Sequence, residues 1–178
     1  MYIYNSNATK HKTFISFYHK DDQKYKKYID DYLSSNIINK SVNDGEYDPD
    51  NSDQYIKRLI REDKISDSSV VVVLIGPNTK GRKHVDWEIY AGLSPSINGN
   101  AGLVGIILPE LEPTTDGKYR YDDMPARLSD NWKSGYADMY TWDYAVNHFD
   151  EIVEKSFNNR IKKKNLIDNS RIQKKYNT

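Results

Sequence analysis

The stretch that decides the fold runs from Ser68 to Leu93, SSVVVVLIGPNTKGRKHVDWEIYAGL. It opens with an unbroken apolar run, Val70 to Ile75, whose four adjacent valines favour a strand because β-branched side chains suit a pleated surface. No polar residue interrupts this run, so both faces of the strand are expected to be buried, as in the centre of a parallel sheet covered by helices. The Gly-Pro-Asn sequence at 76–78 ends the strand.

A helix is predicted next, because Val85, Glu88, Ile89 and Leu93 recur at helical spacing. This spacing puts Glu88 on, or at the edge of, the helix face that turns toward the sheet. One interpretation of Glu88 is an edge carboxylate paired with a lysine or arginine. The other is a catalytic carboxylate just beyond the carboxyl end of a strand, where open α/β sheets bind their ligands.

The segments before this stretch predict two further strands and two helices. Lys12 to Tyr18, KTFISFY, is expected to form the first strand, and Asp21 or Asp22 to cap the following helix. The apolar face predicted for that helix consists of Tyr25, Tyr28, Ile29, Tyr32 and Leu33. A weaker strand over Ile37–Val42 leads into a turn-rich acidic loop, 43–51, after which Ser52 or Asp53 is expected to cap the next helix.

The segments after it complete an alternating α/β pattern. Leu103–Leu108 is a second apolar strand, Met124–Leu128 is expected to make one helical turn, and Ala137–Trp142 a short fifth strand before a helix capped by Asp143. Alternation of this kind predicts a flavodoxin-like sheet of about five mainly parallel strands with helices on both faces. Val70–Ile75 is expected to lie at its centre, between the Lys12–Tyr18 and Leu103–Leu108 strands. We expect a flexible N-terminus over 1–11, one domain over 12–158, and a basic helix extension or solvated tail over 159–178.

Composition excludes several classes of protein. The 178 residues carry 26 basic and 26 acidic side chains, a balance that argues against a general nucleic-acid binder. The absence of cysteine excludes disulfides, thiolate metal sites and a cysteine nucleophile, and the histidines show no metal-ligand spacing. No apolar run approaches the roughly 20 residues of a membrane span, and the first residues lack the apolar core of a signal peptide. A soluble, cytoplasmic protein without a metal site is therefore expected.

Four segments of the chain resemble the TIR domain, and in particular the TIR-like branch found in bacterial Thoeris anti-phage systems. These segments are Thr13–Asp21 (TFISFYHKD), Ser69–Gly76 followed by Asn78, Thr79 and Arg82, Val85 with Trp87-Glu88-Ile89, and Tyr140-Thr141-Trp142. The second segment is the most specific of them. The resemblance covers roughly residues 12–145 and implies the TIR variant of the flavodoxin-like fold.

The resemblance also implies a function. TIR enzymes cleave NAD at the bond between nicotinamide and ribose, and the Thoeris members are similar to cyclases that release an isomer of cyclic ADP-ribose as a signal. The family's catalytic glutamate corresponds to Glu88. NAD is then a substrate rather than a cofactor, and the expected partners are a separate effector protein reached through the nucleotide product, a phage-derived trigger and further copies of the chain. Many TIR enzymes have Trp and Cys four and three residues before the glutamate, where this chain has His84 and Val85.

The chemistry of NAD cleavage suits these residue types. Departure of nicotinamide leaves an oxocarbenium-like cation on the ribose, which one adjacent carboxylate stabilises, and the pyridinium leaves without needing a proton. Backbone N–H groups at 17–19 and the following helix N-terminus are expected to hold the pyrophosphate, with side-chain hydrogen bonds from Ser16 and Asn78. Arg82 is a candidate donor to the Glu88 carboxylate.

Aromatic side chains supply the remaining candidates for the binding site. Phe17, Tyr18 and Trp87 offer surface for a base, and His84 offers a weaker one. Phe17 is alternatively a core residue, Trp87 a cover over the sheet or a subunit contact, and His84 a solvent-facing side chain. Asp44 belongs to a loop, 44–51, that is expected to be mobile and to lie over the pocket.

Two other classes of function remain open at this point. The first is a signalling adaptor, a TIR-type module that acts only through protein–protein contacts and in which Glu88 is structural. The second is a different nucleotide enzyme of similar fold, such as a nucleoside deoxyribosyltransferase-like protein, which also sets a buried glutamate against a ribose. Release of nicotinamide from NAD separates these classes from the NAD-cleaving enzyme.

Overall fold

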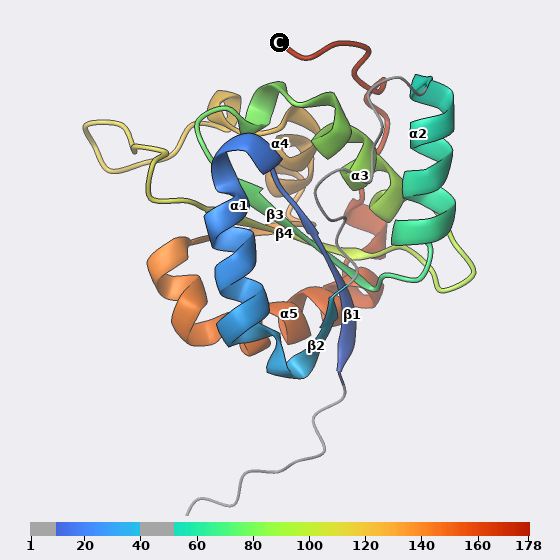
Figure 1. Ribbon diagram of the computed structural model, residues 1–178, viewed down its shortest axis with the longest axis horizontal. Coiled ribbons are helices and arrows are strands. Elements are labelled where there is room, and N and C mark those ends of the chain that lie inside the picture. The colour runs from blue at the N-terminus through green and yellow to red at the C-terminus, as the bar shows by residue number, and fades with distance from the viewer. Residues whose placement is uncertain (1–9, 40–51) are drawn as a thin grey trace, which may run out of the picture.

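A computed structural model describes residues 10–39 and 52–178 as a five-stranded, all-parallel sheet with helices on both faces (Figure 1). The strands lie in the order β2-β1-β3-β4-β5. Their bounds are His11–Ser16 (β1), Ile37–Asn39 (β2), Val70–Ile75 (β3), Gly102–Ile107 (β4) and Asp138–Thr141 (β5). This order is that of the flavodoxin-like fold, so the predicted fold class is confirmed. The rest of the strand predicted over Ile37–Val42, and the loop at 44–51, lie outside the described residues.

Strand β3 lies at the centre of the sheet, as its apolar run predicts. All six of its residues are buried, and it pairs in parallel with β1 through Thr13 and Val70 and with β4 through Val70 and Gly102. A strand covered on both faces has no solvent side to satisfy, which is why valines follow one another without alternation. The prediction that β3 is flanked by the Lys12–Tyr18 and Leu103–Leu108 strands is confirmed.

Alternate side chains of β3 supply two separate cores. Val71, Val73 and Ile75 pack in the core that includes α3 (Lys83–Leu93), together with α2 (Asp53–Leu59) and α4 (Ala126–Lys133). The other three residues of β3 pack in the core that includes α5 (Trp142–Lys162) and the segment after α1 (His19–Tyr28). The molecule is therefore three layers, with α2, α3 and α4 on one side of the sheet and α1 and α5 on the other (Figure 1).

Helix starts differ in part from the sequence prediction. Ser52 caps α2 as expected, since its Oγ accepts a hydrogen bond from the Tyr55 N–H. The predicted cap of the first helix is wrong, because α1 begins at His19 with Tyr18 at the N-cap, and the two aspartates lie in the first turn, where they face the positive end of the helix dipole. The last helix likewise begins at Trp142, one residue before the predicted cap.

The predicted apolar face of the first helix is only partly buried. Ile29 is fully buried, whereas Tyr28 and Tyr32 are 40% and 71% exposed. The physical reason at Tyr32 is that α1 ends at Tyr28 and the chain continues as a π-helical turn, Ile29–Leu33, which changes the angle between successive side chains. Asp22 and Lys26 occupy buried positions of α1 instead.

The C-terminal tail does not continue the last helix into solvent, as one prediction had it. Helix α5 ends at Lys162, and the chain turns through Lys164–Leu166 and runs back over α4 and α3. Asn131 holds it with two hydrogen bonds to the backbone of Asp168, at 2.7 and 2.9 Å. Lys174 N–H then donates to Asp86 Oδ2 at 2.7 Å. We call residues 163–178 the C-terminal strap.

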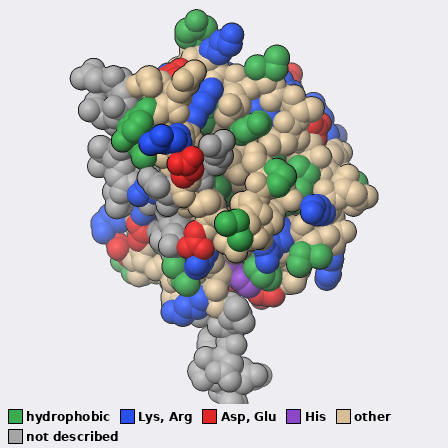
Figure 2. All heavy atoms as spheres, turned by 90° about the vertical axis from the view of Figure 1, so that its right-hand side faces the viewer, with side chains coloured by type: hydrophobic (Ala, Val, Ile, Leu, Met, Phe, Trp, Pro, Cys, Tyr) green, Lys and Arg blue, Asp and Glu red, His purple; other side chains and the backbone are tan. Residues whose placement is uncertain are grey.

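The surface carries both signs of charge. Figure 2 shows one face of the molecule, on which basic side chains lie among acidic and hydrophobic ones. Across the described ranges, no helix combines the length and apolar character that crossing a membrane requires.

Candidate active site

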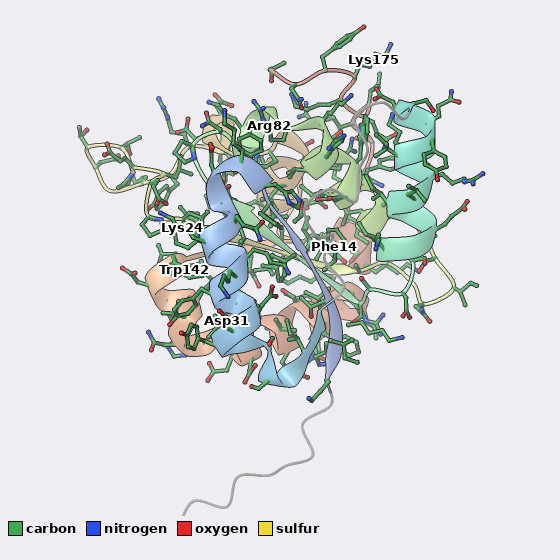
Figure 3. All side chains as sticks on the ribbon, viewed as in Figure 1. Phe14, Lys24, Asp31, Arg82, Trp142 and Lys175 are labelled. Atoms are coloured by element: carbon green, nitrogen blue, oxygen red, sulfur yellow. The ribbon has the colours of Figure 1, made fainter. Side chains whose placement is uncertain are left out.

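The carboxyl ends of β1 and β3 meet where the direction of the strand order reverses. The chain leaves β1 for α1 on one face of the sheet and leaves β3 for α3 on the other, and at such a switch point proteins of this topology bind ligands in a crevice. Figure 3 shows Arg82 at this end of the sheet, close to the start of α1.

Glu88 is a buried carboxylate beside this crevice. Its side chain comes from α3, only 3% of the residue is exposed, and Oε2 accepts a hydrogen bond of 2.5 Å from Ser16 Oγ. Ser16 is the last residue of β1 and is itself fully buried. A buried carboxylate is costly unless polar partners satisfy it, so this hydroxyl fixes the position of one of its oxygens. The structure thus brings together two residues, 72 positions apart, that the sequence predicts for one site.

Two aspartates in the first turn of α1 bind the segment that follows β3. Asn78 Nδ2 donates to Asp21 Oδ2 at 2.7 Å, and Thr79 Oγ1 donates to Asp22 Oδ2 at 3.1 Å. Thr79 Oγ1 also accepts the Gly76 N–H at 2.9 Å. We call these contacts the loop latch. They hold the start of α1 against the segment that follows β3.

Asp22 is the least expected member of the loop latch. Burial raises its pKa from the ordinary 3.8 to about 6, against the opposing effect of the Thr79 hydroxyl, and the nearby Asp21 charge raises it further. Its carboxylate lies so close to Gly76 that a Cβ there would be 2.6 Å from Oδ1. Sequence reasoning interpreted this aspartate as a helix cap and missed its role. The signal that was available is a pair of acids directly after the first strand.

Arg82, the candidate donor to Glu88, stacks over Tyr18 and donates to the loop after β3. Its guanidinium carbon lies 4.6 Å from the centre of the Tyr18 ring, and Nε donates to Asn78 O at 3.2 Å. Its Nη2 donates to Thr178 O at 3.3 Å, so the C-terminal strap helps to hold it. Tyr18, Asn78 and Arg82 therefore lie together, as the sequence predicts for residues of one site.

Trp87 and His84 lie on the part of α3 that the C-terminal strap covers. Trp87 is 1% exposed and its indole N–H donates to Lys174 O at 2.8 Å, while the ammonium groups of Lys57 and Lys83 lie 4.6 and 5.1 Å from the ring. The ring of His84 lies 5.1 Å from that of Trp87. Burial, followed by the charge of Lys83, lowers the pKa of His84, which favours the neutral imidazole.

Two of the remaining candidates lie elsewhere. Phe17 packs in the core on the α5 side of the sheet, with its ring 4.1 Å from that of His19. Its side chain is therefore on the opposite face from α3, and its backbone remains at the crevice. Asp44 lies outside the described residues. Among the residues that are described, no three histidines or carboxylates gather in a way that could hold a metal ion.

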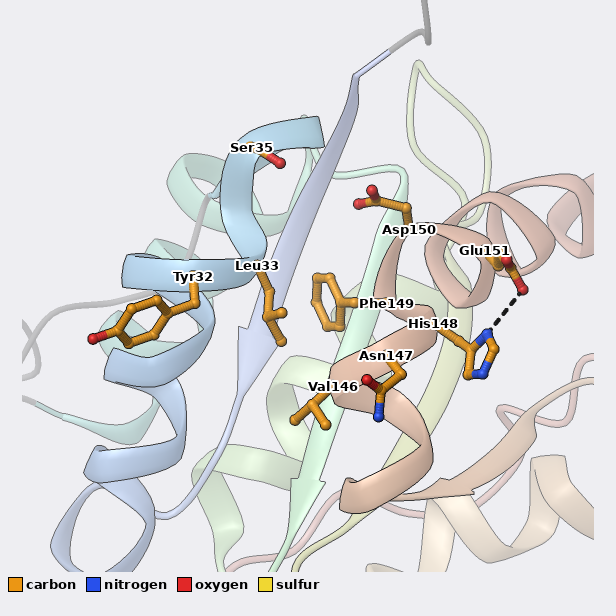
Figure 4. A pocket seen from close by; sticks show the side chains of 9 residues that line it. All are labelled: Tyr32, Leu33, Ser35, Val146, Asn147, His148, Phe149, Asp150 and Glu151. Carbon is orange, nitrogen blue, oxygen red and sulfur yellow. Dashed lines mark hydrogen bonds and ion pairs between the residues drawn. The ribbon is translucent and has the colours of Figure 1, made fainter. Parts of the chain in front are cut away.

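A hollow on the other side of the sheet is separate from this site. It has a volume of about 200 Å³ and lies between the turn that follows α1 and the kink at His148 in α5 (Figure 4). Tyr32, Leu33 and Phe149 line it, and His148 Nδ1 lies 3.3 Å from Glu151 Oε2. Neither Ser16 nor Glu88 is among its lining residues.

Comparison with known proteins places the chain in a family. The model of the "Thoeris protein ThsB, TIR-like domain" family matches residues 14–113. No curated protein is similar enough in sequence to count as a match. Among solved structures, the chain is similar to the TIR domains of the activated Roq1 resistosome directly recognizing the pathogen effector XopQ, with 17% sequence identity, a TM-score of 0.40 and coverage of 83% of this chain and 84% of that one. The family match spans more than half of the 178 residues, and the chain therefore belongs to the ThsB TIR-like domain family.

Proposed function

We propose that this TIR domain is an NAD-processing enzyme, a glycohydrolase or cyclase, with Glu88 as its catalytic carboxylate. The observation that carries the proposal is the burial of Glu88 beside the carboxyl end of β1, with Ser16 Oγ donating to it at 2.5 Å. A charged group that is withdrawn from water acts more strongly on a developing charge than an exposed one does. Membership of the ThsB TIR-like family supports the same assignment.

The proposed reaction breaks the bond between nicotinamide and ribose. Nicotinamide leaves as a neutral molecule and takes the bonding electrons, and the positive charge passes to the ribose, where Glu88 stabilises it. Attack by water then gives ADP-ribose, and attack by a group of the same molecule gives a cyclic isomer. In this proposal Ser16 orients the carboxylate, and Tyr18, Asn78 and Arg82, which lie together beside the loop latch, bind the rest of the dinucleotide.

A wider role in defence follows from the same proposal. The nucleotide product acts as a signal to a separate effector protein, and a phage-derived component or self-association triggers the enzyme in the cytoplasm. This part rests on the Thoeris family alone.

The test compares two buried carboxylates of α3. Glu88→Gln keeps the size of the side chain and removes its charge, so nicotinamide release from NAD is expected to fall on the order of a hundred- to thousand-fold, with the melting temperature nearly unchanged. Asp86→Asn is the structural comparator, because Asp86 is 5% exposed and pairs with Arg127 at 2.9 Å. It should lower the melting temperature and leave the turnover of the folded protein largely intact.

Turnover is measured with purified protein and with an extract of phage-infected cells added as trigger. Glu112→Gln, an exposed glutamate, is the control for a change of charge alone. A folded Glu88→Gln protein with turnover close to that of the wild type would remove Glu88 from the catalytic role.

The alternative is a non-catalytic TIR module that acts through protein contacts. Exposed apolar side chains favour it, among them Tyr32 at 71% and Ile172 at 84% exposure. This alternative predicts no nicotinamide release by the wild type under any trigger, together with binding to another TIR module that is insensitive to Glu88→Gln.

A further inference from the structure

A second pocket, apart from Glu88, lies where the C-terminal strap passes α4. It has a volume of about 440 Å³, within the range of small-molecule sites. It is bounded by α4, by the short helical turns Thr79–Gly81 and Tyr121–Asp123, and by the strap. Four basic side chains from three of these segments line it: Lys80, Lys133, Arg171 and Lys174.

Carboxylates already neutralise two of the four cations. Arg171 forms a two-pronged ion pair with Asp130, at 2.7 and 2.8 Å. Lys80 Nζ lies 3.6 Å from Asp123 Oδ1 and donates to Asp122 O at 3.3 Å. These pairs hold two walls of the pocket in place.

The other two cations have no carboxylate partner within the part of the chain that the structure describes. Lys133 Nζ lies 4.6 Å from the centre of the Tyr121 ring, and Lys174 Nζ donates to Thr178 Oγ1 at 3.0 Å. Each ammonium group has three donors, so both retain hydrogen-bonding capacity toward a ligand. The exposed carboxylate of Asp122 also lines the pocket, and the two ammonium groups of Lys133 and Lys174 outweigh it. Positive charge that remains in excess and faces a pocket from two separate segments attracts an anion.

We propose that this pocket binds a small, multiply charged oxyanion, such as the phosphate groups of a phosphorylated metabolite. Lys133 and Lys174 supply charge-assisted hydrogen bonds to it, and Lys80 and Arg171 add to the positive field. The cation over Tyr121 occupies that ring face, so the ligand is recognised by its phosphates rather than by the stacking of a base.

The pocket is connected to the helix that carries Glu88. The backbone of Lys174 donates to Asp86 Oδ2 at 2.7 Å and accepts the Trp87 indole N–H at 2.8 Å. An anion that holds the Lys174 side chain therefore also holds the strap on α3. Binding is expected to raise the melting temperature, since a ligand of the folded state stabilises it by mass action.

Isothermal titration calorimetry with sodium pyrophosphate tests the proposal at low ionic strength. The wild type is expected to bind with a dissociation constant below about 1 mM. Lys133→Ala and Lys174→Ala should each weaken binding about ten-fold, because each removes one charge-assisted hydrogen bond. Lys133 is exposed and is expected to tolerate the change without loss of fold. Lys162→Ala, which removes an exposed charge of α5 outside the pocket, should leave affinity unchanged.

The outcomes separate this pocket from the proposed NAD site. Glu88→Gln leaves the pocket intact, so pyrophosphate should bind to this variant as it does to the wild type, whether or not the enzyme proposal holds. Titration with ADP distinguishes a free phosphate from a nucleotide. Equal affinity is expected, because only the phosphates are held, and clearly tighter binding of ADP would overturn recognition by phosphates alone. No saturation by 10 mM pyrophosphate, on the order of ten times the expected constant, would overturn the proposal. Equal weakening by Lys133→Ala and Lys162→Ala would overturn it too, because attraction would then follow net charge alone.

Discussion

Replacing Asp22 by asparagine should make the folded protein more stable, and more so at high pH. The carboxylate is 3% exposed in the loop latch, and burial raises its pKa from 3.8 to about 6. The folded chain therefore holds the proton of Asp22 more tightly than the unfolded chain does. Its contribution to stability is fully present below pH 3.8 and is lost as the pH rises through about 6.

The size of this effect follows from the difference between the two pKa values. Each unit of difference corresponds to about 1.4 kcal/mol, so the two units or so at Asp22 correspond to about 3 kcal/mol at most. Asparagine has no charge to desolvate, and its Oδ1 can still accept the hydrogen bond from Thr79. Any cost of refitting the amide against Gly76 is the same at every pH and cancels when two pH values are compared.

Urea unfolding at pH 4 and at pH 8 measures the effect. The free energy of unfolding of Asp22→Asn, relative to the wild type, should be higher at pH 8 than at pH 4 by about 2–3 kcal/mol. Asp21→Asn, which changes the exposed neighbour in the same latch, should alter the pH dependence much less, because the Asp21 charge raises the pKa of Asp22 less than burial does. Parallel curves of stability against pH for the wild type and Asp22→Asn would refute the reasoning.

Two further substitutions test the packing around the site by melting temperature. Arg127→Met should cost about 3–5 kcal/mol because it leaves the buried Asp86 carboxylate without its guanidinium. Adding Asp86→Leu should recover only part of that loss, because the Lys174 N–H then loses its acceptor; no recovery would contradict this explanation. Gly102→Ala should cost about 3 kcal/mol or more, because the new Cβ would lie 2.0 Å from Ser156 O, a backbone atom of α5. Gly105→Ala, whose nearest neighbours are the ends of side chains, should cost less, and the opposite order would count against this account.

The central part of the fold could be predicted because its sequence pattern is local. Val70–Ile75 has no polar residue, so only a strand covered on both faces suits it, and the structure places it there. Ser52 could be predicted as a cap for the same reason, since its hydroxyl reaches only three residues ahead. The π-helical turn that follows Tyr28 has no comparable local signal, and the expected burial of Tyr32 failed with it.

The candidate site also has a part that the sequence predicts and a part that it does not. Glu88 could be placed on the inner face of its helix from spacing, and Ser16 at the end of its strand, and the structure joins them. The partners of Asp22 could not be found, because Thr79 lies 57 residues away and the contact depends on how two loops approach each other. The path of the C-terminal strap could not be predicted for a different reason. Its contact with Trp87 uses a backbone carbonyl of the strap, and every residue has such a carbonyl, so the sequence pattern does not indicate the contact.

The C-terminal strap also has a consequence for the order in which the protein is built. Lys174 bonds to Asp86 from 88 residues further along the chain, so this contact cannot form until synthesis has passed β5 and all of α5. Contacts between residues far apart in sequence form late, because the loop between them must close first. Chains arrested on the ribosome after α5 should therefore hold a formed sheet while Trp87 remains open to solvent. The helix that carries Glu88 is synthesised midway, yet it is among the last parts of the molecule to be completed.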